Sequence, residues 1–138
     1  MGLFDSLGIS GSGLTAQRMR MDVTAENLAN AQSVGYRRKD VVVREAGDAG
    51  GFGGALRNAM AAGNGVEVEQ IAVDQSPGRR VYDPGHPDAD RQGYVTLPNV
   101  NPVTEMVDLI DASRAYEANV TAMSAAKQMF TKTLDLLR

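Results

Sequence analysis

The chain has no cysteine, no tryptophan and only one histidine among its 138 residues. Without cysteine, a disulfide framework and a thiolate zinc site are both excluded, and a chain without thiols suits an oxidising compartment. Aromatic residues make up 5% of the sequence while glycine occurs 15 times, so we expect a modest hydrophobic core. A chain of this length is expected to form one ordinary domain.

Long apolar runs and an excess of positive charge are also missing. No stretch of about 18 apolar residues is present, so the sequence predicts no membrane-spanning helix. The formal net charge of −3 gives no electrostatic reason to expect a nucleic acid partner, because phosphate binding requires a cationic surface. The segment Met1–Asp5 lacks the basic opening and apolar block of a secretory signal. If the chain leaves the cytoplasm, we expect a route that uses no cleaved signal of that kind.

The sequence does contain a long helical pattern in its last third, residues 102–138. Asn101 is a favourable N-cap, Pro102 suits the first helical position, and no further proline or glycine follows. Apolar residues recur there in alternating steps of three and four, the spacing of a coiled-coil seam. The seam consists of Met106, Leu109, Ser113, Tyr116, Val120, Met123, Lys127, Phe130, Leu134 and Leu137, and a second row beside it includes Val103, Val107, Ile110 and Met129. A helix over this range would be roughly 55 Å long, more than a domain of this size can cover, so we expect other helices against it.

The first 34 residues repeat this pattern in a weaker form. The positions are Leu3, Leu7, Ser10, Leu14, Gln17, Met21, Thr24, Leu28 and Ala31. Three glycines in the first half each lower helix stability by roughly 1 kcal/mol relative to alanine. We therefore predict a helix over residues 14–31, preceded by a softer turn or helix, and we expect this segment to pair with the C-terminal helix.

Residues 35–101 have a different character. Short β-like runs occur at Asp40–Arg44, Gly65–Val73, Arg79–Tyr82 and Gly93–Pro98, and residues 46–63 have the composition of a flexible loop. We predict a mainly α fold in which residues 1–34 and 102–138 form a discontinuous helical assembly domain, coiled-coil-like, around a loop-rich β segment. The predicted assembly interface consists of Leu3, Leu7, Leu14, Met21, Leu28, Met106, Leu109, Ile110, Tyr116, Val120, Met123, Phe130, Leu134 and Leu137.

Residues able to perform chemistry are few. His86 lies in sequence among Asp83, Asp88 and Asp90, a set of groups that can bind a metal ion, so a small metal-dependent hydrolase is one alternative function. This loop has little scaffold to orient three ligands, which favours a solvated turn. We therefore predict no catalytic residue, cofactor or metal. The one basic cluster, Arg37–Lys39, is interpreted as a solvated edge or as a partner for acids on a neighbouring subunit.

The segment Asn27–Arg38 resembles the N-terminal signature of bacterial flagellar rod and hook proteins, with Ser33 in place of the usual threonine and Val34 where proline is frequent. The C-terminal helix resembles the same family over residues 105–119, and residues 81–103 resemble its proximal rod members. The resemblance covers the whole chain except the glycine-rich region 46–63. Its most characteristic residues are Asn27, Asn30, Gly35, Tyr36, Arg114, Tyr116, Glu117 and Asn119.

This resemblance implies a structural subunit of the flagellar rod, the shaft that transmits torque from the motor ring to the hook, and not an enzyme. It implies export through the flagellar type III apparatus without a cleaved signal, and assembly in the periplasm. The terminal helices would form the inner tube, the D0-type domain of that family, with the middle segment outside. Expected partners are copies of the chain, other rod proteins, and the base of the rod with its membrane-ring and export-gate components. A soluble coiled-coil adaptor or export chaperone, present as a cytoplasmic dimer, is a further alternative.

Overall fold

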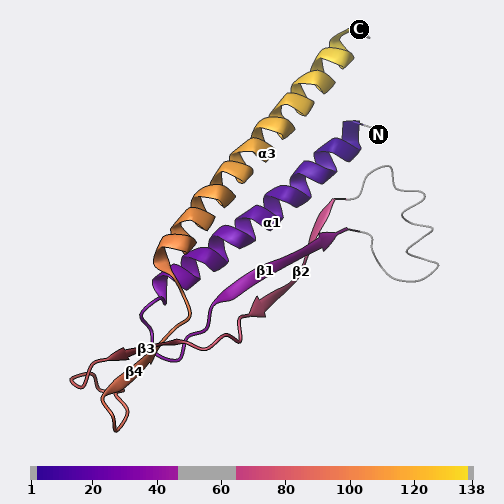
Figure 1. Cartoon of the computed structure of the whole chain (residues 1–138). Helices are drawn as coiled ribbons and strands as arrows, with labels where there is room; N and C mark the ends of the chain where they lie inside the picture. The colour runs from indigo at the N-terminus through magenta and orange to yellow at the C-terminus, as the bar shows by residue number, and fades with distance from the viewer. Residues whose placement is uncertain (1–2, 47–64, 137–138) are drawn as a thin grey trace, which may run out of the picture.

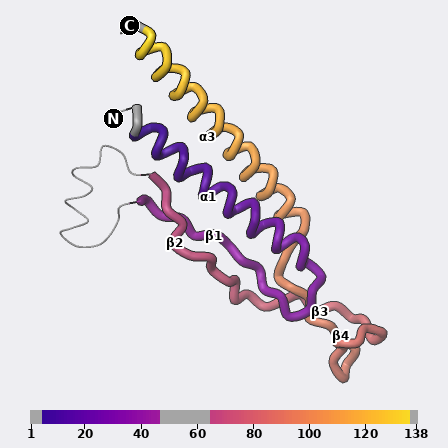
Figure 2. The backbone as a smooth tube through the Cα atoms, turned by 180° about the vertical axis from the view of Figure 1, so that it is seen from behind, coloured from indigo at the N-terminus to yellow at the C-terminus, as the bar shows by residue number. Residues whose placement is uncertain are grey.

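Two long antiparallel helices dominate the computed structural model, which describes residues 3–46 and 65–136 (Figures 1 and 2). The helices are α1 (Leu3–Ala29) and α3 (Pro102–Leu136), and they pack side by side over most of their length. Among the described residues, four strands lie between them in the sequence: β1 (Lys39–Glu45), β2 (Val66–Val73), β3 (Arg79–Tyr82) and β4 (Tyr94–Leu97). The predicted architecture, long helices at both ends with a small antiparallel β segment between them, is confirmed at this level.

The strands form two separate two-stranded antiparallel sheets. In the first, β1 pairs with β2, and a bulge shifts the register between Val42 and Val43. This hairpin lies along α1 on the side away from α3 (Figure 1). The second sheet pairs β3 with β4 and projects beyond the end of the helix pair where α1 stops and α3 starts (Figures 1 and 2).

The start of α3 has the predicted cap. The Asn101 side-chain Oδ1 accepts a hydrogen bond from the Val103 amide at 3.1 Å, and the Glu105 amide donates to the Asn101 carbonyl at 3.0 Å. Pro102 occupies the first helical position, where its missing N–H is not needed. The 35 residues of α3 correspond to a length of about 52 Å.

The regular helix α1 starts at Leu3, so it includes the glycine-containing stretch before Leu14 that the sequence left between a turn and a helix. One physical reason is contact with α3. A Cβ built on Gly13 would lie 3.3 Å from the amide of Asn119, so the missing side chain lets the two helices approach closely. Tertiary packing of this kind offsets the low helix propensity of glycine.

The core is thin and made of small residues. The buried apolar side chains are Ala16, Val23, Val41, Val95, Ala112 and Ala126, and the largest fully buried side chains are polar, Glu105 and Asn27. Neither described helix is long and apolar enough to span a bilayer. The predicted loop 46–63, apart from Ala46, lies outside the described residues, as do Leu137 and the side chain of Leu3.

Candidate assembly site

The turn after α1 accounts for two residues of the signature at Asn27–Arg38. Asn30 closes the helix, because its backbone amide and its side-chain Nδ2 both donate to the carbonyl of the preceding turn, at 3.1 and 2.9 Å. The Tyr36 amide then donates to the Ser33 carbonyl at 3.2 Å. Gly35, the third residue of this turn, has φ of +82°, which favours glycine. Such a turn accepts proline at its second position, which is Val34 here and which explains why proline is frequent at that place in the signature.

Asn27 lies at the centre of a buried polar network. Its side chain is 1% exposed. Its Nδ2 donates to the Lys39 carbonyl at 2.8 Å and to the Glu105 carboxylate at 3.0 Å. Its Oδ1 accepts from the Lys39 amide at 2.9 Å and from the Tyr36 hydroxyl at 2.8 Å. All four hydrogen-bonding positions of the amide are therefore used, and they connect α1, β1 and α3.

Glu105 brings a buried charge to the same network. Its side chain is 1% exposed, and Arg38 Nε donates to its Oε1 at 2.6 Å. This hydrogen bond raises the pKa of Arg38, outweighing the burial that acts in the opposite direction. The Arg38 amide also donates to Asn99 Oδ1 at 3.0 Å, while its guanidinium approaches Asp108 at 3.6 Å. We call Asn27, Tyr36, Arg38 and Glu105 the joint, because these four side chains hold the end of α1, the start of β1 and the start of α3 together.

Each residue of the basic cluster Arg37–Lys39 has a partner within its own chain, although Arg37 is exposed as expected for a solvated edge. Contact of this cluster with a neighbouring subunit stays a prediction. Arg38 belongs to the joint, the Lys39 ammonium pairs with Glu26, and Arg37 donates to Gln75. The hydrogen bond to Glu26 raises the pKa of Lys39. Burial is the main cause of the raised pKa of Tyr36.

The side of α3 that packs on α1 follows a repeat close to the predicted one. Its buried or half-buried residues recur in steps of four and three: Glu105, Leu109, Ala112, Tyr116, Asn119, Met123, Ala126 and Phe130. Of the predicted seam, Leu109, Tyr116, Met123 and Phe130 lie on this side, and Ser113 is half-buried. The predicted residues Met106, Val120 and Lys127 are exposed, and each follows the buried or half-buried residue by one position. Small or polar side chains occupy those positions because α1 lies close to α3 there, and the larger apolar neighbours Met106 and Val120 are exposed.

The predicted interface residues accordingly divide into two groups. Those half-buried within the chain are Leu7, Leu14, Met21, Leu28, Leu109, Tyr116, Met123 and Phe130. Those exposed by 41–52% are Met106, Ile110, Val120 and Leu134. Val103, Val107 and Met129 of the second apolar row are exposed as well. The remaining motif residues lie on α3, where Arg114 and Glu117 are exposed and Asn119 is half-buried.

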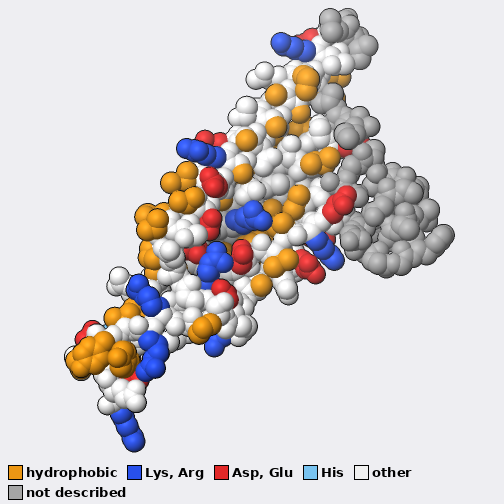
Figure 3. Space-filling model, viewed as in Figure 1, with side chains coloured by type: hydrophobic (Ala, Val, Ile, Leu, Met, Phe, Trp, Pro, Cys, Tyr) orange, Lys and Arg blue, Asp and Glu red, His pale blue; other side chains and the backbone are white. Residues whose placement is uncertain are grey.

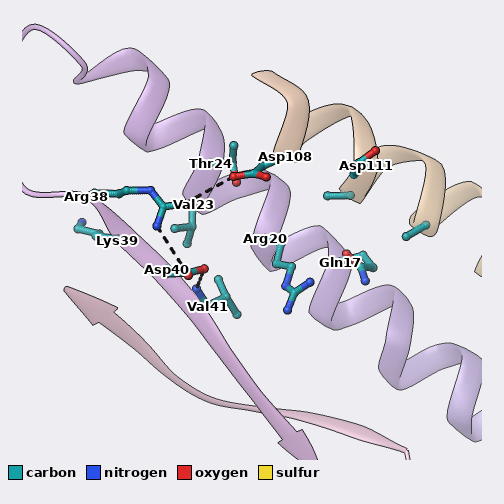
Figure 4. Close-up of a pocket in the computed structure, with 12 residues that line it drawn as sticks. Gln17, Arg20, Val23, Thr24, Arg38, Lys39, Asp40, Val41, Asp108 and Asp111 are labelled. Atoms are coloured by element: carbon teal, nitrogen blue, oxygen red, sulfur yellow. Dashed lines mark hydrogen bonds and ion pairs between the residues drawn. The ribbon is translucent and has the colours of Figure 1, made fainter. Parts of the chain in front are cut away.

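A groove of about 470 Å³ lies between α1, β1 and α3, beside the joint (Figure 4). Its apolar lining includes Val23, Val41 and Ala112, which are 4–6% exposed. Arg20 and Asp111, also in the lining, form no ion pair within the described part of the chain. Its lining holds three basic and three acidic side chains, so their formal charges cancel.

The His86 loop is organised by its own turn. The Asp88 amide donates to His86 Nδ1 at 3.1 Å, and the Gly85 amide donates to Asp83 Oδ1 at 3.2 Å. Asp90 accepts from the Tyr94 amide at 2.9 Å and pairs with an arginine of β3 at 2.9 Å. Within residues 3–46 and 65–136, no three acidic or histidine side chains are placed to hold a metal ion. Nothing in this geometry supports the hydrolase alternative.

The sequence interpretation identified Asn27 and Tyr36 as motif residues but missed the roles of Arg38 and Glu105. A signal for Glu105 was present. It precedes Leu109 by four residues, so it lies in phase with Leu109, Tyr116 and Met123, where an acid is unexpected in an apolar seam. A charge in phase with an apolar seam calls for a buried partner of opposite sign.

Comparison with known proteins identifies the family. Residues 7–37, which contain most of α1 and the signature turn, match a family model described as "Flagella basal body rod protein". Residues 91–136, which contain β4 and α3, match a model described as "Flagellar basal body rod FlgEFG protein C-terminal". The two matched segments therefore include three of the four joint residues, Asn27, Tyr36 and Glu105. Arg38 directly follows the first matched segment.

Curated relatives extend the match over nearly the whole chain. A protein of Bacillus subtilis is 47% identical, with 99% of both chains covered. Proteins of Borreliella burgdorferi and Escherichia coli O157:H7 are 43% and 44% identical, and at least 98% of each chain is covered. The chain therefore belongs to the flagellar basal-body rod protein family, and it is a structural subunit of the flagellar rod. Each of these three relatives carries the name "Flagellar basal-body rod protein FlgC".

Proposed function

We propose that the chain polymerises into the rod through its terminal helices. Residues 1–34 and 102–138 would form one assembly domain, of the coiled-coil-like D0 type, and residues 35–101 would lie outside it. The observation that supports this proposal is the apolar surface of α3 that α1 leaves uncovered. Val103, Val107 and Ile110 are 52–66% exposed on a helix that belongs to an assembling family. Burying a large apolar side chain contributes about 1.5–3 kcal/mol, so neighbouring subunits gain stability by covering this face.

Membership of this family also supports a proposal for the position of the subunit in the cell. We propose that it is exported without a cleaved signal and assembles in the periplasm, with copies of itself, other rod proteins and the ring and export-gate components at the rod base. The absence of cysteine is compatible with that oxidising compartment. The soluble adaptor or chaperone alternative has no support in the relatives, which are rod proteins by name.

Torque transmission requires a subunit whose parts do not move relative to one another. The joint would supply this rigidity, because the buried side chains of Asn27 and Glu105 link α1, β1 and α3 through hydrogen bonds. A load applied to the β segment would therefore reach both helices through the joint.

Replacing Val107 with glutamate in the bacterium that encodes the chain tests the proposal. This exposed position tolerates a charge in the single subunit, so we expect an unchanged thermal melt of the purified chain but loss of the protein from basal bodies and loss of swimming. Thr121→Glu is the matched control, because Thr121 is an exposed polar residue of the same helix. Val107→Glu cells that swim normally and contain normal rods would refute assembly through this face.

A further inference from the structure

The strand β1 has one edge that no other strand covers within the described part of the chain. In an antiparallel pair, alternate residues direct their amide and carbonyl toward the partner strand, and the residues between them direct these groups away. The Asp74 amide donates to the Arg38 carbonyl at 2.8 Å, so the backbones of Arg38 and Asp40 face β2. Lys39 and Val41 therefore present their amides and carbonyls at the open edge of β1.

This open edge lies beside the groove between α1, β1 and α3 (Figure 4). Lys39, Asp40 and Val41 all line the groove, so the space next to their backbone is not filled by another element of the described chain. The amides and carbonyls of an open edge can pair with a strand of another molecule. What prevents such pairing here must therefore come from side chains along the edge.

The first outward-facing residue of β1, Lys39, is covered by the amide side chain of Asn27. Asn27 Nδ2 donates to the Lys39 carbonyl at 2.8 Å, and Asn27 Oδ1 accepts from the Lys39 amide at 2.9 Å. A residue of a neighbouring antiparallel strand would form the same two hydrogen bonds. Asn27 therefore occupies the position that a third strand would take beside Lys39.

The second outward-facing residue, Val41, is covered by the side chain that precedes it. Asp40 Oδ1 accepts a hydrogen bond from the Val41 amide at 2.8 Å. The other oxygen of this carboxylate lies 3.7 Å from the guanidinium of Arg38, which is itself held by Glu105 (Figure 4). The Asp40 carboxylate is therefore directed over the Val41 amide, although its side chain is 65% exposed. We call Asn27 and Asp40 the edge caps.

Two further features act against pairing along this edge. The bulge between Val42 and Val43 shifts the β1–β2 register, and a bulge twists an edge away from a flat partner strand. In Figure 3, apolar side chains gather along the outer edge of α3, whereas acidic and basic side chains lie together over α1 and the start of β1. Charged side chains near a strand edge also disfavour pairing.

We propose that the edge caps prevent β1 from pairing with a strand of a second copy. Each cap places a side-chain oxygen on a backbone amide that a third strand would otherwise bind. A subunit of a polymeric rod has a particular need for such caps, because pairing through β1 would join copies in a second, competing arrangement. This inference does not depend on the proposed assembly through the terminal helices, because it concerns the backbone of β1 in the single subunit.

The variant Asp40→Ala of the purified full-length chain tests this role, with Asp40→Asn as the matched control. Both variants lose the negative charge, but asparagine keeps an oxygen that can accept from the Val41 amide. In dilute Asp40→Ala we expect the Val41 amide hydrogen to exchange roughly tenfold faster than in the unsubstituted chain, the equivalent of one hydrogen bond. At high concentration we expect larger species in which this exchange slows again, because a strand of another copy covers the amide. Hydrogen exchange followed by NMR, with sedimentation of the same samples, measures both effects.

In the unsubstituted chain and in Asp40→Asn, the exchange rate of the Val41 amide should not change with concentration. The proposal is overturned if Asp40→Ala has the exchange rate and the mass of the unsubstituted chain. Larger species of Asp40→Ala in which the Val41 amide still exchanges fast would also overturn it, because the copies would then meet elsewhere. Equal association of the two variants would assign the effect to the lost charge and contradict the role of the hydrogen bond. The Val107→Glu experiment tests the proposed function separately.

Discussion

The two ends of the helix pair differ in how completely a single chain covers them. At the joint, the largest buried side chains of the molecule are polar, and every hydrogen-bonding position of Asn27 has a partner. At the other end, α3 continues past the start of α1 and leaves Leu134 and Met129 half exposed. The joint is complete within one subunit, whereas this end of α3 leaves apolar side chains exposed.

This difference separates folding from assembly within one molecule. Buried polar networks are costly when a partner is missing, so they define one arrangement of the elements that they join. Exposed apolar side chains define no arrangement by themselves but favour any neighbour that covers them. Substitutions at the joint should therefore lower the stability of the isolated subunit, and substitutions at exposed apolar residues such as Val107 and Leu134 should leave it unchanged.

The largest effect is expected for Glu105→Ala. Removing the carboxylate leaves Arg38 and an amide hydrogen of Asn27 without their buried partner, and we expect a loss of about 3 kcal/mol in the free energy of unfolding. Urea unfolding of the purified chain, followed by circular dichroism, measures it. Asp108→Ala is the matched control, since this half-exposed acid approaches the same arginine at 3.6 Å and should contribute at most about 1 kcal/mol. Equal losses for the two variants would show that the buried pair has no special role.

A somewhat smaller loss in the free energy of unfolding is expected for Asn27→Ala. The Lys39 amide, the Tyr36 hydroxyl and the Glu105 carboxylate would each lose a partner in a buried site, with a total cost of about 2 kcal/mol. Asn30→Ala removes a hydrogen bond at an exposed helix end and should cost about 0.5 kcal/mol. The same urea titrations compare them, and a larger effect at Asn30 would contradict the assignment of Asn27 as the centre of the network.

Replacing glycine with alanine is expected to change the stability in opposite directions at two positions, Gly35 and Gly8. Gly35→Ala forces a left-handed conformation on a residue with a Cβ and should cost about 1–2 kcal/mol, although no atom lies within 4 Å of the new carbon. Gly8→Ala, also in open space but within α1, should stabilise the helix by about 1 kcal/mol. Thermal melts of both variants measure the difference, and a destabilised Gly8→Ala would show that α1 is not helical at that residue.

The smallest effect is expected on acidification of the β3–β4 sheet. The hydrogen bond from the Tyr94 amide is the main cause of the lowered pKa of Asp90, and the Gln92 amide and Arg80 act in the same direction. Because the folded state favours the carboxylate, this contribution is fully present above the ordinary pKa of 3.8 and is lost as pH falls through the lowered value. The Tyr94 amide resonance should therefore titrate with a midpoint below 3.8 and lose that transition in Asp90→Asn. A midpoint above 3.8 would rule out this role.

The sequence predicted the helices and strands well because each had a strong local signal. The alternating polarity of Val66–Val73 and the cap at Asn101 are examples. The sequence pattern placed some residues of the α3 seam one position late. A periodicity search favours large apolar side chains, whereas the close contact between the helices at Gly13 leaves room only for small or polar side chains on α3. The pairing of Arg38 with Glu105 joins residues 67 positions apart, so no local pattern reveals it.

A cryo-EM map of the basal body purified from the bacterium that encodes the chain tests the central claim most directly. We expect one subunit to retain the α1–α3 pair with Arg38 against Glu105, and we expect Val103, Val107, Ile110 and Leu134 to be covered by neighbouring subunits. A map in which the joint is intact but these apolar residues face solvent in the assembled rod would contradict the proposal that they drive assembly.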